Sequence, residues 1–185
     1  MNELFLPHAN PLDPGAPQSG LYLAITLSME TERVTELIAS LALRTPLNIV
    51  AGSEWIPNYG VARLLRRRVT HIEAILGRIQ LARAFTCYQL LDLLAGIRPG
   101  NTPVLVLDAL HTFYTDDIPL EARRRTLEGC GRHLQRLSLS RPVAVLAQRT
   151  PSEEYPRFYT MLASLADIVH QMESAEPAVS QPGLF

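Results

Sequence analysis

The sequence predicts an α/β fold: a single domain with a mainly parallel sheet and helices on both of its faces. Three observations lead to this prediction. Short apolar runs alternate along the chain with amphipathic helical segments. Most of these runs are continuously apolar, which is typical of strands that are buried on both faces. The chain has 185 residues, of which 47% are apolar, and this suffices for one packed core.

The first helix is expected between two strands. The apolar run LYLAITL at 21–27 predicts the first strand, and Ser28 is a suitable N-cap for a helix that extends to about Leu43. Proline at position 46 cannot continue that helix, and LNIVA at 47–51 predicts the second strand. The apolar face of the helix consists of Val34, Leu37, Ile38 and Leu41.

The middle of the chain is expected to hold three helices and one strand. After the loop GSEWIPN, a helix is expected at about 59–68 and another at 71–77. RIQLARA at 78–84 predicts the third strand. The next helix spans 86–96 and ends at the turn-forming sequence GIRPGN.

The last third continues the alternation. PVLVLD at 103–108 is a buried run that ends in an acid, and it is the clearest strand of the sequence. A long helix is expected at about 120–139, followed by the strand PVAVLAQ at 142–148. A helix at 157–165 and a strand at 166–172 complete the pattern.

The ends of the chain differ from this core in composition. Residues 1–19 contain four prolines and are interpreted as an extended arm. Residues 20–172 form the expected core domain, and 173–185 are interpreted as a flexible tail.

The composition excludes several classes of protein. No apolar run approaches the ~20 residues that span a bilayer, and the proline-rich start is unlike a secretory signal. Two cysteines suggest a reducing cytoplasm, with association with the nucleoid as a further option. The five histidines and two cysteines have no metal-ligand spacing, so no metal site is expected. All 17 basic residues are arginine, which excludes every mechanism that needs a lysine.

Several segments together resemble the ATPase core of RecA/RadA-type recombinases. The strand VLVLD followed by ALHTFYTDD, the helix ending in RHLQRLSL and the strand PVAVLAQ are similar to its central part. RIQLARAFTCYQLLDLL and LNIVAGSEWIPNYGVARLL resemble segments of the RadA branch. The resemblance covers roughly residues 20–172 and implies a RecA-like, P-loop-type core.

The resemblance implies roles for three polar residues. Asp108 matches the Walker B acid, which orders the Mg²⁺ shell in active members, and Glu54 matches the acid that positions the attacking water. Gln148 matches the glutamine that senses nucleotide and couples it to DNA-binding loops. The residues alone leave another interpretation open, because acids after strands are often turn or cap residues and glutamines there are often merely solvated.

The phosphate-binding part of that family is missing. A P-loop needs glycines whose N–H groups surround the phosphates and a lysine that neutralises them. After the first strand this chain reads TLSMETERVTEL, without either residue, and Glu30 and Glu32 occupy the first helical turn. Arg33 is a single countercharge. We therefore predict a degenerate ATPase core with vestigial site residues and no cofactor; ATP with Mg²⁺ belongs only to the alternative of an active enzyme.

The last five residues, QPGLF, resemble the short peptide with which bacterial polymerases and repair factors bind the β sliding clamp. Gln181 would hydrogen-bond at the edge of an apolar pocket, and Leu184 and Phe185 would fill it. The alternative to clamp binding is that these residues belong to a tail without a partner or to one that packs on the domain.

Two arginine clusters are candidate DNA contacts. Arg66, Arg67 and Arg68 close a helix, where cations also stabilise the helix dipole. Arg123 begins a second triplet on the long helix, and part of its charge is expected to be neutralised by nearby glutamates.

These observations predict a non-catalytic RecA-like accessory protein in DNA repair, recombination or damage tolerance. It would be similar to ImuA-type mutasome components. Its expected partners are a RecA-type recombinase, a translesion DNA polymerase and the sliding clamp. The sequence leaves direct contact with DNA open, and no membrane association is expected. One alternative is a divergent, DNA-dependent ATPase that uses Glu54 and Asp108. The other is a regulator unrelated to DNA that reuses the fold.

Overall fold

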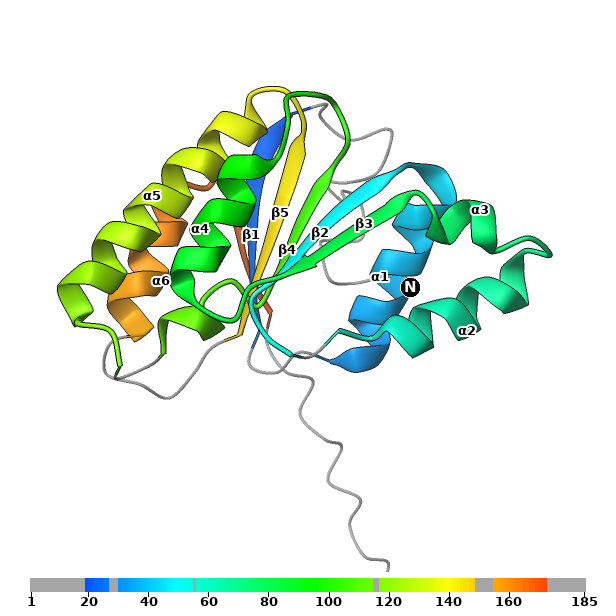
Figure 1. The fold of residues 1–185 in the computed structure, drawn as a ribbon, viewed down its shortest axis with the longest axis horizontal. Helices are drawn as coiled ribbons and strands as arrows, with labels where there is room; N and C mark the ends of the chain where they lie inside the picture. The colour runs from blue at the N-terminus through cyan, green and yellow to red at the C-terminus, as the bar shows by residue number, and fades with distance from the viewer. Residues whose placement is uncertain (1–18, 27–29, 55, 115–116, 149–154, 173–185) are drawn as a thin grey trace, which may run out of the picture.

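The computed structural model describes residues 19–26, 30–54, 56–114, 117–148 and 155–172. These residues form six strands, six α-helices and one short 3₁₀ helix around a single sheet (Figure 1). The α/β class predicted from the sequence is confirmed, and every strand pairing in the sheet is parallel. The expected single domain likewise corresponds to one continuous sheet.

The strands follow the order β3-β2-β4-β5-β1-β6 across the sheet. Their carboxyl ends are aligned, because Thr26 of β1 is in register with Gln148 of β5, and Ala51 of β2 with Leu107 of β4. The strand bounds are β1 Gly20–Thr26, β2 Leu47–Ala51, β3 Ile79–Arg83, β4 Val104–Leu107, β5 Pro142–Gln148 and β6 Ile168–Met172.

The direction in which the chain crosses the sheet determines which face each helix covers. From β1 to β3 the chain moves toward one edge, and from β3 to β6 it moves back across the sheet. Because parallel crossovers are right-handed, the helices of the two stages lie on opposite faces. Figure 1 shows α1, α2 and α3 on one face and α4, α5 and α6 on the other. The helix bounds are α1 Thr31–Arg44, α2 Asn58–Arg68, α3 Glu73–Leu76, α4 Cys87–Gly96, α5 Leu120–Ser138 and α6 Tyr155–Ala163.

Each face of the sheet carries its own apolar cluster. In β1, Leu23 belongs to the cluster beneath α4, α5 and α6, whereas Tyr22 and Ala24 belong to the cluster beneath α1 and α2. Successive side chains of a strand point to opposite faces, so a strand with helices on both sides must be apolar throughout. This explains the continuous apolar runs in the sequence.

The start of α4 illustrates how local sequence positions a helix. The Thr86 side chain accepts a hydrogen bond from the backbone N–H of Gln89 at 3.2 Å. The Gln89 side chain in turn accepts one from the backbone N–H of Phe85 at 2.8 Å. The sequence TCYQ thus satisfies two otherwise unpaired N–H groups in the manner of a capping box.

The predicted elements match the structure, with small shifts at their ends. Helix α6 begins at Tyr155 and ends at Ala163, two residues before the predicted range at each end, and the 3₁₀ helix η1 at His111–Phe113 is not evident from the sequence. Ser28, the expected cap of α1, lies outside the described residues, and Glu30 precedes α1 without a side-chain cap. Within the described part of the chain, no helix combines the length and apolar character needed to cross a membrane.

Candidate functional site

The carboxyl edge of the sheet contains a point where neighbouring strands send the chain to opposite faces. Strand β2 continues into α2 on one face, and its neighbour β4 continues through η1 toward α5 on the other. The loops after two such strands diverge and leave a crevice, which is where parallel α/β sheets bind their ligands. The residues that follow β2 and β4 are Gly52, Ser53 and Asp108.

Asp108 is the most constrained residue of this edge. Its side chain is buried, with 7% of the residue exposed, and its φ of 51° is the only positive value at a non-glycine position among the described residues. Burial raises the pKa of its carboxyl above the usual range, while His111, the Ser53 hydroxyl and the backbone N–H of Gln148 partly offset this by favouring the ionised form. His111 Nδ1 lies 3.7 Å from Asp108 Oδ2.

Strand β2 approaches Asp108 closely through glycine. The N–H of Gly52 donates to the carbonyl of Leu107 at 2.8 Å. A Cβ atom at position 52 would lie 2.4 Å from the backbone oxygen of Asp108, so only glycine fits there. The neighbouring Ser53 hydroxyl is buried and forms no hydrogen bond of standard geometry with the described residues, although it lies near enough to favour the ionised form of Asp108.

The other two residues matched to the recombinase core lie at the same edge. Glu54 directly follows Ser53, and its side chain is exposed. Gln148 is the last residue of β5 and is half-buried, in register with the buried Thr26 of β1. The strand that ends at Gln148 lies next to both β4 and β1. The structure therefore brings together the neighbourhoods of all three residues predicted from the sequence.

The start of α1 faces this edge with acidic residues. Helix α1 begins directly after Glu30, and Glu32 lies in its first turn. Arg33, the only nearby cation in the sequence, forms an ion pair with Glu30 at 2.7 Å between Nε and Oε2. The pairing occupies the charge of Arg33, and the two acids make this helix start poorly suited to a phosphate group.

The structure divides the arginine candidates. Arg66 and Arg67 are exposed at the end of α2, whereas the guanidinium of Arg68 is bound to the carboxylate of Glu36. Arg123 is buried, with 4% exposed, and donates from Nη1 to the carbonyl of Phe113 at 2.8 Å. A buried guanidinium cannot contact DNA, so the interpretation of Arg123 as a DNA contact is corrected.

Neither cysteine has the properties of a catalytic nucleophile. Cys87 and Cys130 are free and buried. Burial raises the pKa of Cys130 to about 12, and it also raises that of Cys87, so both remain protonated thiols near neutral pH. Among the described residues, no group of three or more His, Cys, Asp and Glu side chains is placed to hold a metal ion.

The proposed clamp peptide with Gln181, Leu184 and Phe185 lies outside the described residues, as does the arm at 1–18. The same holds for Trp55, next to Glu54.

A groove at the opposite, amino edge of the sheet is not evident from the sequence. Its volume is about 560 Å³, and its polar lining includes Asn48, Gln80, Arg98 and Arg141. The sequence feature that could have indicated this groove is a polar residue inside each of two strands, Asn48 in β2 and Gln80 in β3.

No protein-family model matches the chain, and a search of curated proteins finds no significant match.

Proposed function

We propose that the protein is a non-catalytic RecA-like accessory factor in DNA repair, recombination or damage tolerance. It acts by binding protein partners: a RecA-type filament, a translesion polymerase or the sliding clamp. The sequence resemblance suggests this class, and the arrangement at the carboxyl edge supports it.

The adjacency of β1, β5 and β4 supports the recombinase-like part of the proposal. A nucleotide-hydrolysing core of this kind needs three groups close together: the phosphate loop, a sensor residue and the magnesium-ordering acid. In this chain the end of β1, Gln148 and Asp108 occupy neighbouring strand ends. This arrangement agrees with the positions that the resemblance implies.

The start of α1 supports the proposal that the protein is not a catalyst. Glu30 and Glu32 lie where a nucleotide phosphate would bind, and the Arg33 charge is already paired with Glu30. Each carboxylate opposes a phosphate a few ångströms away by roughly 1 kcal/mol in water and more at a protein surface. Burial of Asp108 raises the pKa of its carboxyl and so penalises the ionised form, which is the form that binds Mg²⁺.

Calorimetric titration of the full chain with MgATP tests this proposal. We expect no heat of binding at micromolar concentrations and no ATP turnover, with or without DNA. Binding in the micromolar range would overturn the non-catalytic proposal and favour a divergent ATPase that uses Glu54 and Asp108.

The partner class needs a separate experiment. We expect the full chain to retain a RecA-type recombinase or the sliding clamp in a pull-down with purified components. The variants Asp108→Ala and Glu54→Ala should retain these partners equally well if the edge is vestigial. Failure to retain any repair component would instead favour a regulator unrelated to DNA.

A further inference from the structure

The groove at the amino edge of the sheet exists because α4 leaves part of one face uncovered. This helix connects β3 to β4, but it packs mainly against α5 and makes only minor contact with β2 (Figure 1). The exposed strip of sheet forms the floor of the groove, and the loop after α4 forms the opposite wall. The volume of about 560 Å³ lies within the usual range for small-molecule sites.

The floor of the groove is polar, whereas the neighbouring strand β4 is apolar throughout. Asn48 of β2 and Gln80 of β3 are direct partners in the parallel register, so both amides lie on the same face of neighbouring strands. Each amide offers two donors and one acceptor oxygen. Neither residue belongs to the apolar clusters that fill the two faces of the sheet. The pair therefore forms a hydrogen-bonding surface rather than part of the core.

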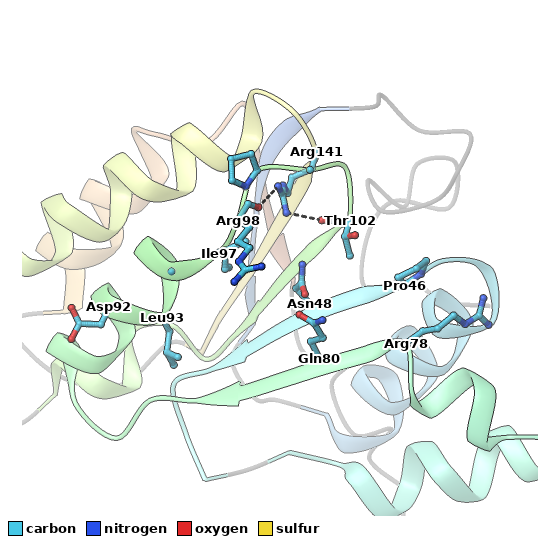
Figure 2. A pocket seen from close by; sticks show the side chains of 13 residues that line it. Pro46, Asn48, Arg78, Gln80, Asp92, Leu93, Ile97, Arg98, Thr102 and Arg141 are labelled. Carbon is cyan, nitrogen blue, oxygen red and sulfur yellow. Dashed lines mark hydrogen bonds between the residues drawn. The ribbon is translucent and has the colours of Figure 1, made fainter.

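The wall of the groove carries positive charge. In Figure 2 the Arg98 side chain extends from the loop toward Asn48 and Gln80. Arg98 is exposed, and its guanidinium takes part in no hydrogen bond or ion pair within the described part of the chain. Arg78 also lines the groove, but its guanidinium is directed to the other side, where it donates to the carbonyl of Ala42 at 3.2 Å.

Arg141 adds a second, buried cation to the same wall. Only 1% of this residue is exposed. Its guanidinium donates to the carbonyl oxygens of Arg98 at 2.7 Å and Thr102 at 3.3 Å, which fixes the loop (Figure 2). The Nε atom is buried without a hydrogen-bond partner among the described residues. Burying a cation against carbonyl oxygens alone is costly, and an anion nearby would reduce that cost.

The only acidic residue among those that line the groove is Asp92, and Figure 2 shows its carboxylate directed away from Asn48 and Gln80. The charge facing the floor is therefore positive. A guanidinium binds phosphate and carboxylate groups through paired hydrogen bonds, and the amides can bind the polar atoms beside them.

We propose that this groove binds a small molecule with a phosphate or carboxylate group, whose anion pairs with Arg98 and whose polar atoms contact Asn48 and Gln80. The site lies at the edge of the sheet opposite Asp108 and does not depend on the function proposed above. Arg141 holds the loop that presents Arg98, and its positive charge favours the anion.

The test is a titration of the ¹⁵N-labelled full chain, followed by NMR, with inorganic phosphate in one arm and succinate in the other. Sodium chloride at equal ionic strength serves as the reference, because phosphate also stabilises proteins non-specifically. We expect saturable shifts of the side-chain NH₂ signals of Asn48 and Gln80. Saturation with phosphate alone indicates a phosphate ester, and saturation with succinate alone indicates a carboxylic acid.

Two variants make the test specific. Arg98→Ala removes an exposed side chain and should weaken binding about tenfold, as expected for a lost charge-assisted hydrogen bond. Arg63→Ala removes an exposed arginine on α2, outside the groove, and should leave binding unchanged. The proposal is overturned if neither anion shifts the amide signals, or if Arg98→Ala saturates at the same concentrations as the unaltered protein.

Discussion

Asp108 combines two properties that its place in the sequence does not reveal. An acid after a buried strand is readily predicted to lie at the carboxyl edge of a parallel sheet. Its positive φ and its burial arise from contacts with Gly52, with η1 and with the end of β5, which are distant in the sequence or lack a sequence signal. The place of Asp108 at the carboxyl edge could therefore be predicted from the sequence, whereas its burial and the raised pKa of its carboxyl could not.

The burial of Asp108 should make stability depend on pH. Because its pKa in the folded state is raised above 3.8, ionisation costs stability, and the cost grows as pH rises from 3.8 through the folded pKa. Asn tolerates the positive φ and cannot ionise. We expect Asp108→Asn to gain free energy of unfolding relative to the unaltered protein between about pH 4 and pH 7, with the smallest gain below pH 4.

Urea unfolding at several pH values measures this difference. Asp92→Asn is the control, because Asp92 is exposed on α4 and its replacement should change stability little at any pH. A difference for Asp108→Asn that does not vary with pH would contradict the assigned effect of burial.

Gly52 should tolerate no side chain. A Cβ atom there would lie 2.4 Å from the backbone oxygen of Asp108, and neither strand end can move freely. We expect Gly52→Ala to lower the free energy of unfolding by roughly 1–3 kcal/mol or more. Gly96→Ala is the matched control, because nothing lies within 4 Å of a Cβ atom at that position. It should be neutral or stabilising by up to about 1 kcal/mol in the same denaturation experiment.

At the scale of elements, helix periodicity separates arginines that look equivalent in the sequence. Arg123 precedes Leu127 by four residues and lies on the buried stripe of α5 with Cys130, Leu134 and Leu137. This spacing was present in the sequence, so the burial of Arg123 could have been predicted. Its partner could not, because Phe113 belongs to η1, a short helix without a sequence signal.

Arg123 and its neighbour Arg124 therefore provide a matched pair. Arg123 binds the carbonyl of Phe113 and stacks over the ring of Phe158, with the guanidinium carbon 5.9 Å from the ring centre. We expect Arg123→Ala to lower the free energy of unfolding by about 2–3 kcal/mol, since the carbonyl of Phe113 loses its buried donor and the contact with the Phe158 ring is lost. Arg124→Ala should change it little, because Arg124 is exposed and pairs with Glu121 at the surface, where such ion pairs are screened by water.

Guanidinium denaturation of both variants measures the two effects. Equal losses for Arg123→Ala and Arg124→Ala would show that the contacts of Arg123 with η1 and α6 contribute little to the fold.

At the scale of the whole molecule, the layers of helices on both faces of the sheet could be predicted from the sequence, whereas the groove at the amino edge could not. Continuously apolar strands and one-sided helices require a sheet covered on both faces, whatever the details of packing. Asn48 and Gln80 form the floor of a groove for a different reason: α4 packs on α5 and leaves these two side chains uncovered. Such an offset between helix and sheet results from packing across the whole domain and has no local signal.

The two edges of the sheet carry different polar groups. The carboxyl edge has Glu30, Glu32 and Glu54 together with Arg33 and Arg83, whereas the groove at the amino edge has the exposed Arg98 above the amides of Asn48 and Gln80. Neither edge explains the proposed binding to the sliding clamp, which depends on the last five residues.

Deletion of residues 181–185 should abolish capture by the sliding clamp. Short docking peptides concentrate their energy in a few apolar anchors, and burying Leu184 and Phe185 contributes roughly 1.5–3 kcal/mol each. Ordering the peptide offsets part of this at ~1–2 kcal/mol per residue. The net affinity should be on the order of micromolar, which is sufficient to raise the local concentration of a tethered partner.

Surface plasmon resonance on immobilised clamp measures this binding, and thermal unfolding of the truncated chain is the necessary companion. We expect the melting temperature to be unchanged, because the sequence predicts that residues 173–185 form a flexible tail outside the core. A chain in which Leu184 and Phe185 are replaced by Ala should behave like the deletion, since these anchors carry the energy. If the truncated chain binds the clamp as tightly as the full chain, the sequence match is coincidental. If it melts several degrees lower, these residues pack on the core.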